Sequence, residues 1–286
     1  MLRRSLLFIP GNNPAMLQNA EVFGSDTVII DLEDAVIIDA KDTARELVSN
    51  FLSAFPITKS EVMIRINGLD TEFGLLDLEK VVSDNIDSIM IPKATIEDVQ
   101  QLSDVLTKLE KERNMKKTIK IVPIVELAKS VLQLETIAQF ERVNGVLLGA
   151  EDLTSDMQVQ RTESGDEILY ARTKIIMICK ANKIDAIDTP YTNTRNDEGL
   201  KVDSAKAKML GMSAKACIHP NQVPVVNKAF APTVKEIEYA KRVLAAVEQA
   251  KIEQKGAFSI DGKMIDKPII MRAETTLEKA RKFNLL

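Results

Sequence analysis

Residues 29–36 read IIDLEDAV, an aliphatic run that turns acidic without a break. Val28 extends the run on its amino side, and Asp31, Glu33 and Asp34 place three carboxylates within four positions. The aliphatic part predicts a short buried β-strand. Carboxylates at the edge of an apolar core cost free energy unless a cation or a hydrogen-bond donor pairs with them. We therefore expect a charged partner for this acidic cluster.

Similar short apolar runs recur along the whole chain. Most are rich in Val and Ile and lack clean polar alternation, which is typical of strands covered on both faces. Segments with helical spacing separate them, at residues 75–82, 94–112, 168–181 and 205–210. The eight runs are SLLFI from Ser5, TVIID from Thr27, VMIRI from Val62, SIMI from Ser88, IKIVPIV from Ile119, VNGVLLG from Val143, DAID from Asp185 and AKACI from Ala214.

Repeated alternation of strand and helix favours an α/β fold, a (β/α)₈ TIM barrel. The alternative is an open doubly wound sheet, which favours a glycine-rich phosphate-binding turn after its first strand. The first turn here reads PGNNP and has one glycine, so we prefer the barrel. We expect residues 1–230 to form the catalytic barrel domain. Residues 231–286 are expected to form a C-terminal helix, over 234–254, and a lid segment.

Composition excludes several classes of protein. The 286 residues are 45% hydrophobic and 28% charged, with a net charge of −4 and no Trp, which disfavours nucleic-acid binding. No stretch approaches the ~20 apolar residues of a membrane span. The apolar run at residues 6–9 is too short for a signal peptide and ends at Pro10. Two cysteines, Cys179 and Cys217, fit a reduced protein better than a disulfide, so we expect a cytoplasmic location.

Barrel closure would bring the residues that follow all eight strands to one rim, where TIM-barrel active sites lie. Nearly every run ends in an ionisable or hydrogen-bonding side chain. These residues are Glu33 and Asp34, Arg65 and Asn67, Lys93, Glu126, Glu151 and Asp152, Asp188 and Thr189, and His219. One such ending is commonplace, but the repetition predicts a polar site at the rim.

Glu126 and Asp152 follow adjacent predicted strands, so their carboxylates are expected to share one hard cation. Mg²⁺ suits them because it prefers oxygen ligands, often one or two carboxylates, and keeps waters that substrate can displace. The alternative is that both residues form salt bridges or helix N-caps, which are common. For the pair together we favour the metal.

Arg65 is the expected anion-binding residue, because a guanidinium presents a fixed fork to an oxyanion or a carboxylate. The acidic cluster is expected to orient Arg65 or to hold a catalytic water, in a charge network with Arg3, Arg4, Arg65 and Lys93. Lys93 is either a phosphate contact or an ordinary rim lysine. His219 is a minor candidate for a base, since a lone histidine is more often structural.

The same segments carry a family resemblance. LRRSLLFIPGNNP, IIDLEDAV, MIRIN, MIPKA, VPIVE, LLGAEDL, AIDTPYT, ACIHPNQ and IDGKMID follow one another in this order. In this the chain resembles the citrate lyase beta branch of the HpcH/HpaI aldolase superfamily, thioester C–C lyases that include malyl- and citramalyl-CoA lyases. The resemblance covers nearly the whole chain. One departure is His219, where the beta branch often has Asn, and this weakens an essential role for it.

The resemblance implies a TIM barrel, Mg²⁺ dependence and a homo-oligomer, a trimer or a larger assembly. It implies that Arg65 contacts substrate and that Glu126 and Asp152 hold Mg²⁺. The aspartate of the MID motif, Asp266, is implied as an acid/base delivered from a neighbouring subunit. When the strand-end and charge-network residues are added to these, the expected catalytic residues are Arg65, Asp266, Glu33 and Asp34. The expected substrate contacts are Arg65, Glu126, Arg4, Lys93 and Asp188.

The expected reaction is cleavage of a 3-hydroxyacyl thioester on CoA or an acyl carrier protein, with citryl thioester giving oxaloacetate and an acetyl thioester. Further citrate lyase subunits are expected partners. One alternative is a stand-alone citramalyl-CoA or malyl-CoA lyase. Another is a non-catalytic subunit that binds the carrier.

Overall fold

The structure, a computed structural model, describes residues 2–252 and 258–286. It divides into two compact units. One is Arg3–Ala229, and the other contains Leu2 and Phe230–Leu286. Each unit is described by itself below.

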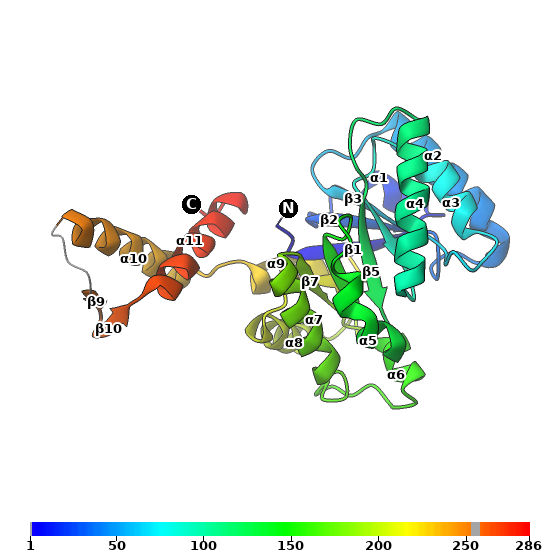
Figure 1. Ribbon diagram of the computed structural model, residues 1–286. Coiled ribbons are helices and arrows are strands. Elements are labelled where there is room, and N and C mark those ends of the chain that lie inside the picture. Colours follow the sequence, from blue (N-terminus) through cyan, green and yellow to red (C-terminus); the bar gives the residue numbers. More distant parts are fainter. Residues whose placement is uncertain (1, 253–257) are drawn as a thin grey trace. The chain divides into compact units, whose positions relative to one another are not determined.

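The larger unit consists of strands with helices packed around them (Figure 1). The strands are parallel and form a closed barrel in sequence order, in which β1 pairs with both β2 and β8. The strands are β1 (Ser5–Pro10), β2 (Thr27–Asp31), β3 (Glu61–Arg65), β4 (Ser88–Ile91), β5 (Lys120–Val125), β6 (Gly145–Leu148), β7 (Asp185–Asp188) and β8 (Ala214–Cys217). The predicted (β/α)₈ TIM barrel is confirmed, and each of the eight apolar runs contributes one strand.

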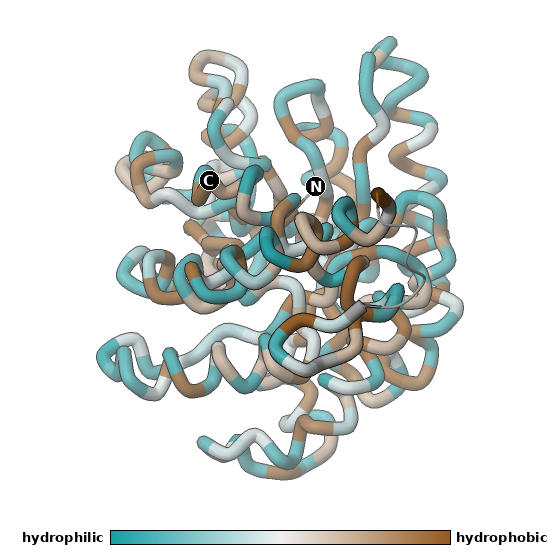
Figure 2. Tube along the Cα trace, turned by 90° about the vertical axis from the view of Figure 1, so that its left-hand side faces the viewer, coloured by the Kyte–Doolittle hydropathy of each residue, from teal (hydrophilic) through white to brown (hydrophobic). Residues whose placement is uncertain are grey.

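Helices connect the strands and surround the barrel. They are α1 (Pro14–Gln18), α2 (Lys41–Ala54), α3 (Gly74–Val81), α4 (Ile96–Glu112), α5 (Ala128–Ile137), α6 (Ala150–Asp156), α7 (Leu169–Asn182), α8 (Asp197–Leu210) and α9 (Gln222–Phe230), with a 3₁₀ turn, η1 (Ile38–Ala40), before α2. Hydrophilic and hydrophobic residues alternate along their traces, as amphipathic helices on a core require (Figure 2).

Side-chain caps determine where several helices begin. Thr95 and Asp98 form a capping box that starts α4, and Asn196 caps α8 nine residues before the predicted helix at 205–210.

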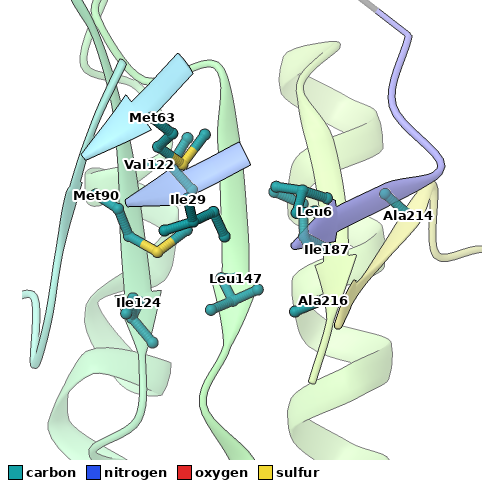
Figure 3. Packing of buried hydrophobic residues seen from close by; sticks show 10 residues of the cluster. All are labelled: Leu6, Ile29, Met63, Met90, Val122, Ile124, Leu147, Ile187, Ala214 and Ala216. Carbon is teal, nitrogen blue, oxygen red and sulfur yellow. The ribbon is translucent and has the colours of Figure 1, made fainter. Parts of the chain in front are cut away.

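The barrel interior is filled by one set of alternating side chains. Leu6, Ile29, Met63, Met90, Val122, Ile124, Leu147, Ile187, Ala214 and Ala216 form a single buried cluster (Figure 3). The residues between them, such as Val28 and Ile30 on β2, are also fully buried, under the helices. Burial on both faces explains why the runs lack polar alternation.

The amino end of the barrel is closed by a buried ion-pair network around Arg3, whose side chain donates to both oxygens of Glu61 at 2.6 Å. It also donates to Asp185 at 3.0 Å. Thr27 and Ser88 donate hydroxyl hydrogen bonds to Glu61 at 2.7 and 3.1 Å. Both carboxylate oxygens of Glu61 are therefore paired within the protein.

The smaller unit contains α10 (Val234–Ile252), a hairpin of β9 (Phe258–Ile260) and β10 (Lys263–Ile265), and α11 (Lys267–Lys282). The hairpin turns at Asp261 and Gly262, both with positive φ, as a two-residue hairpin loop requires. Residues of α10, β10 and α11, including Val243, Ile265 and Leu277, share an apolar core. The predicted helix at 234–254 is present to Ile252, and its last two residues lie outside the described ranges.

Among residues 2–252 and 258–286, no helix combines the length and hydropathy that crossing a lipid bilayer demands.

Candidate active site

A pocket of about 460 Å³ opens at the carboxyl ends of the barrel strands. Its apolar lining includes Phe8, Ile124, Leu147 and Ile218. Its polar lining includes Asp31, Asp34, Arg65, Glu126, Glu151, Asp152 and Thr189. Six of the residues predicted from the strand ends therefore line one cavity, at the end where barrel enzymes hold their active sites: Asp34, Arg65, Glu126, Glu151, Asp152 and Thr189.

Strand alternation decides which side chains reach this cavity, because every second residue faces the same way. On each strand, the residue two positions after the last core side chain also points inward, and it lies at the mouth of the barrel. These pairs are Ile29 and Asp31 from β2, Met63 and Arg65 from β3, Ile124 and Glu126 from β5, and Ile187 and Thr189 from β7.

Arg65 is held by carboxylates on two edges of its guanidinium. Its Nε and Nη2 donate to the two oxygens of Asp31 at 2.7 and 2.5 Å. Its Nη1 lies 3.0 Å from Glu33 and 3.3 Å from Asp34. The ring of Phe8 lies 5.0 Å below the guanidinium carbon, a cation–π contact. Burial lowers the pKa of Arg65, but Asp31 outweighs it and the pKa is raised, so the fork stays charged.

This arrangement answers the question raised by residues 29–36. Asp31 is the fixed partner of Arg65, and it also accepts hydrogen bonds from the amides of Glu33 and Ala35 at 2.9 and 3.1 Å. These bonds set the turn after β2 and place the next two carboxylates beside the same guanidinium. Burial raises the pKa of Glu33 to about 7, because Arg65, whose charge is shared with Asp31 and Asp34, offsets only part of the desolvation.

Glu126 is buried at the mouth of the barrel, with 5% of its surface exposed. The backbone amide of Lys93 donates to its Oε1 at 2.7 Å. Burial raises the pKa of Glu126 to about 7, the Lys93 amide opposes the shift, and Asp152 adds to it. Asp152 is exposed in the first turn of α6 and lines the same pocket. Two carboxylates from adjacent strands thus lie close enough to repel each other.

The donor set fits Mg²⁺. Within the described part of the chain, no cluster of three or more His, Cys, Asp or Glu side chains is arranged to hold a metal ion. Mg²⁺ does not require such a cluster, because it commonly takes one or two carboxylates and completes its shell with water and substrate oxygens. Glu126 and Asp152, facing a pocket with room for a small acid, meet that requirement.

Two predicted substrate contacts are wrong. Arg4 precedes β1, and its guanidinium pairs with Asp26 just before β2, at the amino end of the barrel and away from the pocket. Asp188 is fully buried and points outward from β7, where Arg172 and Lys215 bind it at 2.6–3.0 Å. Strand alternation is the physical reason. Because Ile187 points into the barrel, Asp188 points outward to the helix layer, and Thr189 is the β7 residue that lines the pocket.

Three further predicted site residues, Lys93, His219 and Asp266, do not line the pocket. Lys93 is exposed at the rim, and what reaches the site is its backbone amide. His219 is exposed and its Nδ1 accepts a hydrogen bond from the amide of Asn221 at 3.2 Å. Asp266 belongs to the smaller unit, where it caps α11 by accepting from the Ile269 amide at 3.1 Å. Its catalytic role stays a prediction.

The sequence reasoning missed two residues that line the candidate site. Phe8 lies beneath Arg65, and Gly149 lies against Glu126. Phe8 is two residues after the inward-facing Leu6, so strand alternation would have predicted that it also points inward. Nothing in the sequence around Gly149 indicates that it contacts Glu126. The cysteines, both free and buried, take no part in the site, and burial raises the pKa of each thiol to about 12.

A closed (β/α)₈ barrel whose carboxyl-end pocket gathers one arginine and several carboxylates defines a barrel enzyme that acts on anionic substrates through an oxygen-liganded cation. Residues 4–220 match the family model described as HpcH/HpaI aldolase/citrate lyase, and the chain belongs to that family.

Curated relatives match over nearly the whole chain. Citrate lyase subunit beta of Leuconostoc mesenteroides subsp. cremoris is 40% identical over 288 residues, which are 100% of this chain and 95% of the relative. The protein of the same name from Haemophilus influenzae is 40% identical, over 98% of this chain and 97% of its own. Mitochondrial citramalyl-CoA lyase of Rattus norvegicus is 30% identical over 97% and 86%.

Solved structures agree with this family. CitE from Mycobacterium tuberculosis, in complex with magnesium, acetoacetate and coenzyme A, has a TM-score of 0.79 and 29% identity, covering 98% of both chains. Citrate lyase beta subunit from M. tuberculosis, complexed with oxaloacetate and magnesium, has a TM-score of 0.67 and 27% identity, covering 81% of this chain and 98% of that one.

Proposed function

We propose that the protein is a Mg²⁺-dependent carbon–carbon lyase that cleaves a 3-hydroxyacyl thioester, converting a citryl thioester to oxaloacetate and an acetyl thioester. The observation that carries the proposal is the convergence of Arg65, Glu126 and Asp152 on one pocket. Relatives named citrate lyase subunit beta, at 40% identity over the whole chain, support the reaction. The neighbour solved with oxaloacetate and magnesium supports both the product and the metal.

Glu126 and Asp152 would hold the metal. When bound, Mg²⁺ supplies Lewis acidity to the oxygens of a hydroxy acid and of the keto acid formed from it. The raised pKa of Glu126 means that the metal-free carboxyl is easily protonated near neutral pH, so cation binding requires the loss of that proton.

Arg65 would stabilise the charge that develops during cleavage. The substrate hydroxyl would give its proton to Glu33 or to the water that Glu33 orients. A carbonyl then forms at that carbon, and the C–C electron pair moves into the leaving thioester as an enolate. A preorganised cation beside the enolate oxygen lowers this barrier. Asp31 fixes one edge of the Arg65 fork, while Asp34, whose side chain is 72% exposed, is the partner a substrate oxygen can most easily displace.

Glu33 and Asp34 would set the orientation of Arg65 and the proton balance of the pocket. Glu33 lies against the guanidinium at 3.0 Å, and its pKa of about 7 allows it to take up or release a proton at neutral pH. We propose that Glu33 orients Arg65 and a catalytic water.

Asp266 would protonate the enolate carbon, or remove its proton in the reverse direction, from the smaller unit of a neighbouring subunit. Mixing Asp266→Ala and Arg65→Ala proteins, each inactive alone, should restore part of the activity, because mixed oligomers contain sites with both residues intact. Absence of any restored activity would place Asp266 in the same chain as its site, or outside the reaction.

We further propose a homo-oligomer that binds an acyl-CoA or acyl-carrier-protein thioester, works with other citrate lyase subunits and resides in the cytoplasm. The CoA complex of the M. tuberculosis neighbour supports the carrier arm. The two free, buried cysteines are compatible with a reducing compartment.

The test is an assay of the purified chain, alone, with citryl-CoA, citramalyl-CoA and malyl-CoA, in Mg²⁺ and after chelation. Formation of oxaloacetate from citryl-CoA, lost on chelation, is the expected result. Faster cleavage of citramalyl-CoA or malyl-CoA would replace the substrate but keep the reaction class. Failure to cleave any of them, alone or with an acyl carrier protein, would contradict the lyase function.

A further inference from the structure

Lys93 has a backbone conformation that few residues with a side chain adopt. Its φ is +47°, in the left-handed region, directly after β4 and Pro92. Such a conformation is unfavourable for a residue with a Cβ and persists only where surrounding contacts over-determine it. The next amide, of Ala94, donates to the carbonyl of Ile124 at 3.2 Å, so the turn is attached to the end of β5.

The consequence of this turn is the direction of one N–H group. The Lys93 amide donates to Glu126 Oε1 at 2.7 Å, while the Lys93 side chain is exposed and does not line the pocket. On the opposite side, Gly149 lies so close to Glu126 that an added Cβ would be 2.5 Å from Oε2 and 2.6 Å from the Glu126 Cβ. Glu126 is thus held between a donor and a backbone that leaves room for nothing larger than hydrogen.

We propose that residue 93 is a positioning residue that acts through its backbone: its left-handed turn aims its amide at Glu126 and fixes the carboxylate, with Gly149, in the orientation that Mg²⁺ binding uses. The inference rests on the proposed function for the identity of the metal. The contact itself belongs to the metal-free chain. The Lys93 side chain, expected to meet a phosphate, has no part in this role.

The decisive comparison is between Lys93→Asn and Lys93→Val. Both remove the same charge and most of the side chain, but Asn tolerates positive φ whereas a β-branched residue does not. Isothermal titration with Mg²⁺ should give Lys93→Asn and Lys93→Gly a Kd within about threefold of wild type. Lys93→Val should bind about 10–100-fold more weakly, as loss of a hydrogen bond to a metal ligand does elsewhere.

Lys183 provides the matched control. It is also a lysine with positive φ, +58°, but it ends α7 and its amide bonds a helix carbonyl. Lys183→Val should lose comparable stability and keep wild-type Mg²⁺ affinity. Equal Mg²⁺ affinity in folded Lys93→Val and Lys93→Asn would overturn the proposal. Equal weakening of Mg²⁺ binding in all three Lys93 variants would also overturn it, because the effect would then come from loss of the lysine side chain.

A second measurement needs neither metal nor turnover, and so separates this inference from the proposed function. The amide of residue 93 should exchange slowly with deuterium in the metal-free protein and faster in Glu126→Ala, because its acceptor is gone. Unchanged exchange in that variant would refute the contact even if the lyase activity stands. If the wild-type chain bound no Mg²⁺, the metal part of the proposed function would fail, and the exchange result alone would decide whether residue 93 holds Glu126.

Discussion

The two ends of the barrel each hold an arginine among carboxylates, with opposite outcomes. At the amino end, Arg3 is paired with Glu61 and Asp185, and hydroxyl groups complete the bonding of Glu61. At the carboxyl end, Arg65 is shared by Asp31, Glu33 and Asp34, and Glu126 and Asp152 line the same pocket. The chemical groups are the same, but the amino-end (lower) cluster is buried and sets two carboxylates against one guanidinium, whereas the carboxyl-end (upper) cluster borders a pocket and sets five carboxylates against one guanidinium.

The pKa values report this difference. Burial by itself raises the pKa of Glu61, but hydrogen bonds and charge from Arg3 outweigh it, so the pKa is lowered. Burial likewise raises the pKa of Glu33 and Glu126, and there the opposing interactions are too weak, so both reach about 7. In the upper cluster one guanidinium is shared among several carboxylates, so desolvation prevails and the carboxyls of Glu33 and Glu126 are easily protonated near neutral pH.

Breaking the lower cluster should have the largest effect, and it should act on stability. Glu61→Ala leaves Arg3 partly unpaired in the core, so the free energy of unfolding should fall by about 3–5 kcal/mol. Urea denaturation measures this. Glu61→Gln, which keeps the shape and some hydrogen bonds, should lose less, and activity per folded molecule should stay near wild type. A loss under about 0.5 kcal/mol in Glu61→Ala would show that water replaces the pair.

In the upper cluster, Arg65→Lys should act on turnover. Lysine keeps the charge but loses the fork that engages Asp31 and substrate together, so kcat/KM should fall about 10²–10³-fold, as on removal of an oxyanion donor. Steady-state kinetics with citryl-CoA measures this, and the unfolding free energy should change less than in Glu61→Ala because water reaches the rim. Wild-type kinetics in this variant would remove Arg65 from the reaction.

The metal ligands come next. Glu126→Ala and Asp152→Ala should each weaken Mg²⁺ binding by at least about 10–100-fold, since losing a ligand cannot cost less than losing a group that orients one. Calorimetry measures the affinity, and Glu151→Ala, from the same turn of α6, is the matched control and should stay within about threefold of wild type. Unchanged affinity in either alanine variant at 126 or 152 would exclude that residue as a ligand.

The smallest effect is in pH dependence. The folded pKa of Glu126 lies above the value of 4.5 for an unperturbed glutamate, so the proton stabilises the metal-free fold, and this contribution is lost as pH rises through about 7. Mg²⁺ competes with that proton, so the Kd should tighten about tenfold between pH 6 and pH 8. Calorimetry in buffers of different ionisation enthalpy should show proton release on binding at pH 6. A flat Kd across this range would mean that Glu126 is already ionised.

The barrel could be predicted because each strand carries its own signal. Eight aliphatic runs, buried on both faces and separated by helical stripes, determine the order of elements, and closure then follows from the number of βα units. The same logic located Arg65, Glu126 and Asp152, since residues directly after strands meet at one rim. It failed for Asp188, which is one residue out of phase with Ile187. Arg4, an expected substrate contact chosen without that logic, precedes its strand and pairs with Asp26.

The amino-acid sequence by itself determined the fold, the rim and the residue types present there, because hydrophobic periodicity and strand ends are local properties. Only the tertiary structure decided which charges meet. Three contacts in the site join residues from different βα units. Arg65 donates to Asp31, the Lys93 amide donates to Glu126, and Gly149 packs against Glu126. Hydrogen bonding and electrostatics act over a few ångströms in space, and distance along the chain does not specify those contacts until the barrel closes.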